Sequence, residues 1–198
     1  MPTRSPATSK RQELIAIASR LFYAQGYGMT GIKQIIEEAG IAKGTFYTHF
    51  ASKEELGLAW LQDRHQRWTA MMTAELEALD TPAAKILGIF GFLASWMEDD
   101  GYRGCAFINT CAETPDCDSP LRQEVASHKQ GLHAMFQDLA CQHRGLKDNS
   151  GDNAEARQLG TILYLLFEGA LLEAQIFRDQ WPIQAARTHV ESLLNSAA

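Results

Sequence analysis

Between residues 43 and 49 the sequence carries five hydrogen-bonding side chains in close succession: Lys43, Thr45, Tyr47, Thr48 and His49. Lys, Thr, Tyr and His side chains donate hydrogen bonds, and phosphate oxygens and the edges of DNA bases accept them. Phe46 and Phe50 are four residues apart, so on a helix they share one face. The pattern predicts a short helix with apolar anchors behind and donors in front, as in helices that enter a DNA groove.

A tight turn must precede this short helix. Gly40 can adopt the positive φ that ends the helix before it, and Ile41 supplies an apolar side chain for the angle between the two helices. Gly44 leaves the entrance of the short helix almost free of side chains. The turn and the helix together predict a helix-turn-helix.

Supporting helices are predicted on both sides of this motif. Apolar residues at helical spacing indicate one helix over 10–25 and another over 30–39, with Thr30 as the N-cap of the second. Ser52 is a further N-cap, with Glu55 three residues later as a capping box, and a long helical pattern follows it. The expected head is therefore three helices joined to a long fourth helix.

Residues from about 10 to 56 resemble the DNA-binding domain of the TetR family of bacterial transcriptional regulators. The matching residues, in order, are Thr30, Ala39, Gly40, Ile41, Gly44, Thr45, Tyr47, His49, Phe50, Ser52, Lys53, Glu54 and Leu56. Two positions depart from the family pattern: Gly31 replaces a second Ser or Thr, and Ala42 replaces a Ser. Both departures reduce the expected phosphate contacts and leave the fold unchanged.

The resemblance implies a set of DNA-binding residues: Thr30, Lys43, Gly44, Thr45, Tyr47, Thr48, His49 and Lys53. Phosphate contacts are expected from Thr30, Tyr47, His49 and Lys53. Base edges or methyl groups are expected to be contacted by Lys43, Thr45 and Thr48. Two alternatives stay open, because Tyr47 also suits a packing role and Lys53 also suits an exposed charge at a helix start.

One short recognition helix reads only a few base pairs, so useful affinity for double-stranded DNA requires two of them. A homodimer with twofold symmetry would place the two helices about 34–36 Å apart, in successive major grooves of a near-palindromic operator. The expected protein is a repressor that leaves this operator when a small molecule binds. An adaptor that binds only protein is a more remote alternative.

The remainder of the chain is also helical in pattern, and the predicted fold class is all-α with about nine helices. Further helices are predicted from Thr81-Pro82, from Ser119-Pro120 to about 143, over about 156–178, and from Trp181-Pro182. The predicted organisation is a flexible arm over 1–9, a helix-turn-helix domain over 10–55 and a ligand-binding and dimerisation domain over 56–198.

The pattern over 156–178 is apolar on two sides, so this helix needs two packing partners. One partner is its own domain, and the other is the same helix of a second chain. The candidate interface residues are Leu159, Leu163, Leu166, Ala170, Ala174, Val190 and Leu194.

Large aromatic and apolar residues in the C-terminal region are candidates for lining an effector pocket. They are Trp60, Trp68, Met71, Phe92, Trp96, Cys105, Phe107, Phe136, Tyr164 and Phe167. An apolar or aromatic effector fits this composition. Each of these residues has the alternative of being ordinary core.

Cys105 belongs to a second, weaker resemblance: Gly104, Cys105, Phe107, Asn109, Ala112, Glu113, Leu121 and Arg122 are similar to a segment of one broad TetR subgroup. That subgroup includes regulators that sense electrophiles or oxidants through a Cys at this position. A helix start at Cys105 and the neighbouring Arg103 would both favour its thiolate. A thiol-based repressor responding to electrophiles is therefore an alternative function, and a buried apolar Cys is the competing explanation.

Composition supports a DNA-binding head on an acidic body. The 198 residues carry a net charge of −6, yet residues up to Lys53 contain seven Lys or Arg against three Asp or Glu. A basic segment on an acidic chain fits local binding to phosphate. The four Cys match no zinc pattern or disulfide framework, and no uninterrupted apolar run reaches the roughly 18 residues that span a bilayer. We expect a cytoplasmic protein.

An enzyme is the rival class, and no sequence feature favours it. The chain has no Gly-rich phosphate loop, no Gly-x-Ser-x-Gly and no His-Glu-x-x-His. Its acidic pairs are adjacent in sequence, so their side chains point in different directions. No catalytic residue, metal ligand or cofactor is predicted.

Overall fold

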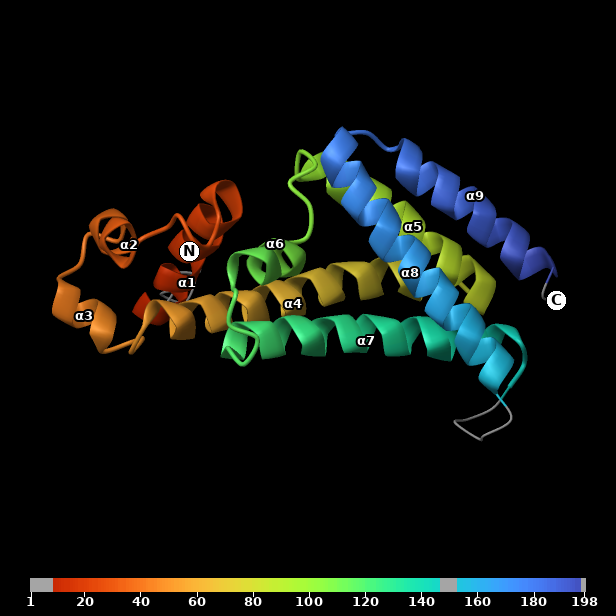
Figure 1. The fold of residues 1–198 in the computed structure, drawn as a ribbon, viewed down its shortest axis with the longest axis horizontal. Coiled ribbons are helices and arrows are strands. Elements are labelled where there is room, and N and C mark those ends of the chain that lie inside the picture. The colour runs from red at the N-terminus through yellow and green to blue at the C-terminus, as the bar shows by residue number, and fades with distance from the viewer. Residues whose placement is uncertain (1–8, 147–152, 197–198) are drawn as a thin grey trace, which may run out of the picture. The chain divides into compact units, whose positions relative to one another are not determined.

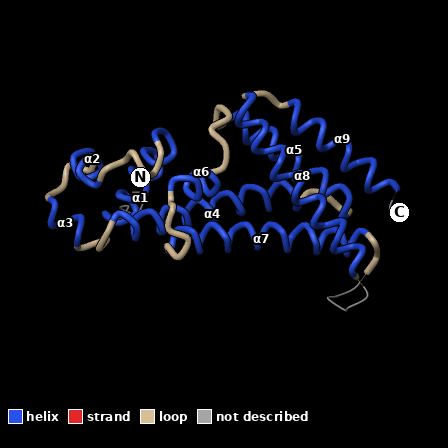
Figure 2. Tube along the Cα trace, viewed as in Figure 1, coloured by secondary structure: helices blue, strands red, loops and turns tan. Residues whose placement is uncertain are grey.

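A computed structural model describes residues 9–146 and 153–196, and within these ranges the chain forms nine helices and no strand (Figures 1 and 2). The helices are α1 (Lys10–Gln25), α2 (Ile32–Glu38), α3 (Lys43–Tyr47), α4 (Lys53–Glu77), α5 (Pro82–Asp99), α6 (Ala106–Glu113), α7 (Pro120–His143), α8 (Ala154–Phe177) and α9 (Trp181–Ser196). The predicted all-α class is confirmed. The arm predicted over 1–9 lies outside the described residues except for Ser9.

The chain divides into two compact units. The first unit consists of residues up to Gln66 together with Ala106–Ala126, and the second consists of Arg67–Cys105 together with the chain from Ser127 onward. The first unit therefore contains the helix-turn-helix and also α6 and the first turns of α7. The domain boundary between residues 55 and 56 stays a prediction. The two compact units have other boundaries, because the first unit extends to Gln66 and also includes Ala106–Ala126.

In the first unit, α1 begins and ends where its sequence signals place it. Ser9 is its N-cap, and the backbone N–H of Gln12 donates to the Ser9 hydroxyl. Gly26 closes the helix with a φ of 99°, and its N–H donates to the carbonyl of Phe22. After α2, Gly40 has the predicted positive φ, 61°. These two glycines fix the turns on either side of α2.

The start of α2 differs from the expectation. Its N-cap is Gly31, with extended φ and ψ, and not Thr30. Thr30 is fully buried, and its hydroxyl donates to the carbonyl of Gly26 at 2.8 Å while accepting from Gln25 Nε2 at 3.0 Å. Its side chain thus stabilises the turn between α1 and α2, so the helix begins one residue later than a Thr30 cap would require.

In the second unit, aromatic side chains from several helices form one cluster around Trp68 of α4. The ring centroids of Phe92 and Trp96 lie 5.5 Å and 6.2 Å from that of Trp68, and Phe167 lies at 6.5 Å. Edge-to-face packing of this kind adds to the burial energy of the rings. The cluster joins α4, α5 and α8 within this unit.

Helix α8 packs against α5 and α9 in the second unit. Gly160 allows a close approach to α7, because a Cβ there would lie 2.4 Å from the Cα of Gln137. By length and composition α8 is long and apolar enough to cross a membrane, although Glu168 interrupts its apolar run; the core helix of a soluble protein passes the same test. Glu168 lies within this helix, but the mean hydropathy of its apolar 18-residue stretch is still 1.4. Its contacts with α5 and α9 are those of a core helix of a soluble protein.

Candidate nucleic-acid interface

Helix α3 has the two-sided arrangement that its sequence predicts. Phe46 and Phe50 are fully buried, with ring centroids 6.1 Å apart, and they anchor the helix in the first unit. Lys43, Tyr47 and Thr48 are exposed. The helix therefore presents a polar surface that no other part of the described first unit covers.

The exposed residues of α3 are held in different ways. Tyr47 is 45% exposed, with its ring against the edge of Phe46 at 5.2 Å, so it both packs and reaches solvent. The Thr48 hydroxyl donates to the carbonyl of Thr45 at 2.7 Å, which leaves its oxygen available as an acceptor. Lys43 Nζ lies 6.0 Å from the centroid of the Tyr47 ring. Thr45 and His49 are partly exposed.

Lys53, at the first turn of α4, has internal partners. Its ammonium group lies 4.3 Å from the centroid of the Tyr27 ring and donates to the carbonyl of Gly28 at 3.3 Å. Burial lowers the pKa of Lys53, and the carboxylate of Glu113 opposes that shift. The Lys53 side chain is therefore held in one place before any DNA is present.

The burial of Thr30 limits what its side chain can do. Because its hydroxyl is engaged with Gly26 and Gln25 and has no exposed surface, it cannot reach a phosphate without a change in the turn. Gly44 is exposed, and a Cβ there would meet no atom within 4 Å. The entrance of α3 is therefore open, as expected.

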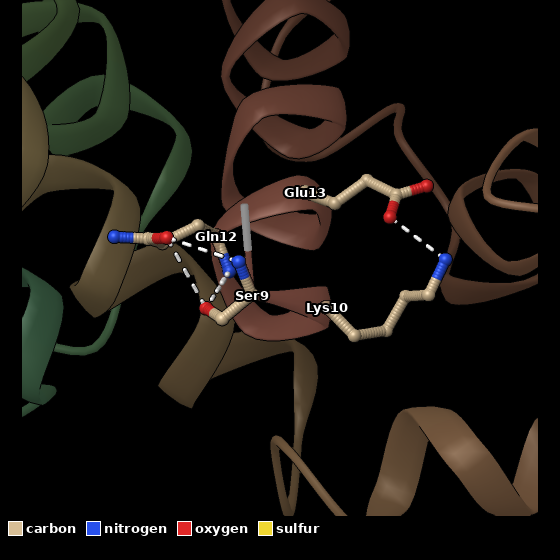
Figure 3. A network of polar contacts seen from close by, with 4 residues as sticks. All are labelled: Ser9, Lys10, Gln12 and Glu13. Atoms are coloured by element: carbon tan, nitrogen blue, oxygen red, sulfur yellow. Dashed lines mark hydrogen bonds and ion pairs between the residues drawn. The ribbon is translucent and has the colours of Figure 1, made fainter. Parts of the chain in front are cut away.

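Lys10 and Arg11 begin α1, where the sequence places basic side chains that could lie along a phosphate backbone or belong to a solvated terminus. Ser9 and Gln12 form a capping box, and Lys10 Nζ pairs with Glu13 Oε2 at 2.7 Å (Figure 3). The Arg11 guanidinium lies 4.8 Å from the centroid of the Phe50 ring. Arg11 thus borders the anchor of α3, and only the fold reveals this position.

The candidate effector residues are distributed over both units. Trp60 and Phe107 belong to the first unit, where Trp60 packs edge-on against Phe22 at 5.1 Å. The others belong to the second unit, where Phe136 and Phe167 are buried and Met71 is 49% exposed. Within the second unit the aromatic members contact one another.

Cys105 lies just before α6, close to a cation from α7 that the sequence did not suggest. Lys129 Nζ lies 3.6 Å from Cys105 Sγ and also pairs with both carboxylate oxygens of Glu168 at 2.7 Å. Cys105 is 6% exposed. The thiol is thus a buried group beside an ion pair.

The residues expected at the dimer interface are mostly inside the protomer. Six of the seven are buried there: Leu159, Leu163, Ala170, Ala174, Val190 and Leu194. Leu166 is partly exposed. Within the protomer these six side chains pack on the rest of the second unit, four of them from α8 and two from α9. A different apolar face of α8 is left exposed.

Among residues 9–146 and 153–196, no group of three or more His, Cys, Asp and Glu side chains is placed to hold a metal ion.

A three-helix unit with an exposed, donor-bearing third helix defines a helix-turn-helix DNA-binding protein. Residues 14–59 match the family described as "Bacterial regulatory proteins, tetR family", and residues 82–190 match "Tetracyclin repressor-like, C-terminal domain". The chain belongs to the TetR family of bacterial regulatory proteins, and it is a DNA-binding regulator of transcription.

Relatives align over nearly the whole chain. The "HTH-type transcriptional repressor NemR" of Escherichia coli (strain K12) is 25% identical over 196 residues, covering 95% of each protein. The "HTH-type transcriptional repressor DhaR" of Mycobacterium sp. (strain GP1) is 28% identical over 191 residues, covering 96% of this chain and 94% of DhaR. The crystal structure of SCO4454, a TetR-family transcriptional regulator from Streptomyces coelicolor, superposes with a TM-score of 0.83 at 28% identity and covers 95% of both chains.

Proposed function

We propose that this regulator is a homodimeric repressor that binds a near-palindromic operator and leaves it when a small molecule binds. The observation that carries the proposal is the exposed donor surface of α3, anchored by the buried Phe46 and Phe50. NemR and DhaR, which are similar over almost the full chain, are both named repressors. Repression follows when a protein occupies DNA that transcription needs.

DNA contacts are divided between two groups of residues. Lys43, Thr45 and Thr48 read base edges or methyl groups in the major groove, and Tyr47, His49 and Lys53 contact phosphates. Thr30 contributes through the turn that it stabilises, since its hydroxyl is buried and bonded within the protein. Gly44 lets the backbone of α3 approach the DNA closely.

Dimerisation uses the exposed face of α8. Its apolar members are Ile162, Leu165, Leu172 and Ile176, which are 38%, 60%, 41% and 61% exposed. They recur with Gly169 at alternating spacings of three and four residues, the repeat of a helix that packs lengthwise on another helix. Gly169 lies at the middle of this stripe with open space around it, so a partner helix can approach closely there.

An open hollow of about 480 Å³ continues this stripe toward the N-terminal end of α8. Its lining includes Gln158, Leu159 and Ile162. An exposed apolar stripe on an otherwise soluble protein is typical of a protein interface. A second copy of the same chain related by a twofold axis would cover both stripes at once.

The effector is an apolar or aromatic small molecule that binds among the aromatic residues of the second unit. Trp68 and its neighbours Phe92, Trp96 and Phe167 make ring contacts that an aromatic effector can replace with contacts of the same kind. Release of DNA requires that the effector bind one arrangement of the protein more tightly than the DNA-binding one.

A thiol-based response is a second candidate, favoured by the Lys129 ammonium 3.6 Å from Cys105 Sγ. The thiolate is the form of a cysteine that attacks electrophiles. In this version the Cys105 thiolate adds to the activated C=C bond of a quinone-type electrophile: the carbon–sulfur bond forms as the π bond breaks, and the resulting enolate takes up a proton from water. The adduct takes the place of a bound effector. A regulator of either kind works in the cytoplasm, where the DNA is.

Selection of bound duplexes from random double-stranded DNA tests the main proposal. We expect a near-palindromic consensus with half-sites about one helical turn apart, bound by a dimer with an affinity that falls steeply with salt. A footprint upstream of the neighbouring gene should then cover such a site. Enrichment of no sequence, or binding by a monomer to a single half-site, would contradict the proposal.

A further inference from the structure

The loop between α1 and α2 is held by a residue far away in the sequence. The backbone N–H of Gly28 donates to the Glu113 carboxylate at 2.5 Å, and Glu113 is the last residue of α6. A Cβ at Gly26 would lie 2.8 Å from one carboxylate oxygen, and a Cβ at Gly28 would lie 3.2 Å from the other. Two glycines therefore leave the space that this carboxylate occupies.

The other side of the same peptide segment contacts the start of α4. The Gly28 carbonyl accepts from Lys53 Nζ at 3.3 Å, and the Lys53 ammonium lies over the Tyr27 ring. Gly28 thus bonds to Glu113 through its N–H and to Lys53 through its carbonyl. Glu113 and the proposed phosphate-binding Lys53 are connected through one residue.

A second contact reaches the same turn of α4 from the segment after α6. Ser119, which is 4% exposed, donates from its hydroxyl to Glu54 Oε1 at 2.8 Å. About one turn further on, the Tyr27 ring and the Leu121 side chain lie at 2.8 Å and 3.2 Å from the position of a Cβ at Gly57. Residues 113–121 therefore pack on the loop and on α4 at several points.

We propose that Glu113 is a positioning residue for DNA binding: by holding the Gly28 peptide it sets where the Lys53 ammonium lies, and Ser119 supports this through Glu54. The inference rests on the proposed phosphate contact of Lys53. It is unexpected from charge alone, since an acidic side chain near a phosphate-binding Lys should weaken DNA binding. Removal of Glu113 should therefore weaken DNA binding if Glu113 positions Lys53, and strengthen DNA binding if only its charge matters.

The test measures the affinity of the full-length protein for its selected operator over a range of salt concentrations. We expect Glu113→Ala to weaken binding roughly tenfold, the effect of about one hydrogen bond to a charged group. The slope of log affinity against log salt concentration should become less steep by about 0.9, the amount that corresponds to the loss of one phosphate contact. Glu113→Gln keeps an acceptor oxygen at the same reach and should bind nearly as the wild type does.

Two comparisons separate positioning from charge. Glu37→Gln removes an exposed carboxylate of α2 that does not contact the loop, and it should bind DNA at least as tightly as the wild type. Glu113→Asp keeps the charge but shortens the side chain, so it should weaken DNA binding as Glu113→Ala does. It also replaces Glu113→Ala in the test if the Ala variant does not fold. Tighter binding by Glu113→Ala, or wild-type binding by Glu113→Asp, overturns the proposal.

A double-substitution cycle tests the route through Lys53. If Glu113 acts by placing Lys53, the variant with both Glu113→Ala and Lys53→Ala should bind no more weakly than Lys53→Ala alone. Additive losses overturn the inference and leave the proposed function intact. The proposed function fails separately, if the wild-type protein selects no operator.

Discussion

The ammonium nitrogen of Lys129 lies 2.7 Å from both carboxylate oxygens of Glu168, in a pair whose two side chains are each 17% exposed. Lys129 belongs to α7 and Glu168 to α8, so the pair joins two helices of the second unit. Burial acts to lower the pKa of Lys129, but Cys105 and Glu168 together outweigh it, and the pKa is raised. The charged form of Lys129 is thus stabilised by its surroundings.

Breaking this pair should destabilise the protein. We expect Lys129→Ala to lower the free energy of unfolding by about 2 kcal/mol, because it leaves a mostly buried carboxylate without its cation. Lys33→Ala is the matched control, since Lys33 and Glu37 form an exposed pair at 3.7 Å; its effect should stay below about 0.5 kcal/mol. Urea unfolding of both variants makes the comparison, and equal losses would contradict the prediction.

Substitutions on α3 and α4 should separate sequence reading from phosphate contact. Lys43→Ala should change the preference among operator variants, at a cost of about 1–3 kcal/mol for the favoured base pair. Tyr47→Phe combined with Lys53→Ala should weaken binding to all duplexes alike and flatten its salt dependence. Competition binding with single-base operator variants gives both results. Equal losses on every sequence for Lys43→Ala would rule out a reading role for Lys43.

An acidic substitution on the exposed stripe of α8 should separate the dimer. Leu165 is 60% exposed, and Leu165→Asp places two charges at the proposed interface, one from each chain. We expect a monomer in sedimentation at micromolar concentration, with operator affinity reduced at least tenfold because one head remains. Met71→Asp replaces another half-exposed apolar residue, on α4, and should remain dimeric.

Alkaline pH should destabilise the first unit through Tyr27. Burial, with a smaller effect of Glu54, raises the pKa of Tyr27 to about 12 from its ordinary 10.0. A raised pKa means that the Tyr27 contribution is fully present below pH 10 and is lost as the pH rises toward 12. Tyr27→Phe should therefore reduce the stability lost between pH 9 and pH 11 by about 1 kcal/mol, discounted because the ring is only half buried.

The thiol hypothesis has a direct test in Cys105→Ser. If Cys105 is the sensor, quinones should release the wild-type protein from its operator and leave the Ser variant bound. Lys129→Met should slow the release, because it removes the cation beside the sulfur. Release of Cys105→Ser at the wild-type rate would eliminate this candidate and favour a non-covalent effector.

Local signals in the sequence predicted most helix positions. Helix α1 occupies the predicted range, and α5 begins with Thr81 accepting from the Ala84 N–H and Pro82 in the first turn, as its sequence indicates. Helix α6 was not separated from its surroundings, because eight residues give too little periodicity for a pattern. The cap of α2 was misplaced by one residue, since the Thr30 hydroxyl bonds to the preceding turn.

The polar surface of α3 was also predictable, because the side chains that form it are neighbours in sequence. The role of Glu113 was not predictable: its place in the second resemblance was visible, but its partner Gly28 is 85 residues away in the sequence. The same holds for Lys129 and Glu168, which are 39 residues apart. The interface on α8 required the fold for another reason: two apolar sides were evident, but only packing shows which one the protomer covers.

The grouping of Ala106–Ala126 with the helix-turn-helix bears on how regulators of this kind are recombined. A hybrid made by joining residues 1–55 to the C-terminal part of another regulator would keep Gly26 and Gly28 but lose the carboxylate that fills the space between them. The transplanted piece would also lack the Ser119 hydroxyl that bonds to Glu54. To exchange DNA specificity between such proteins, the 106–126 segment should therefore be transplanted together with the N-terminal residues.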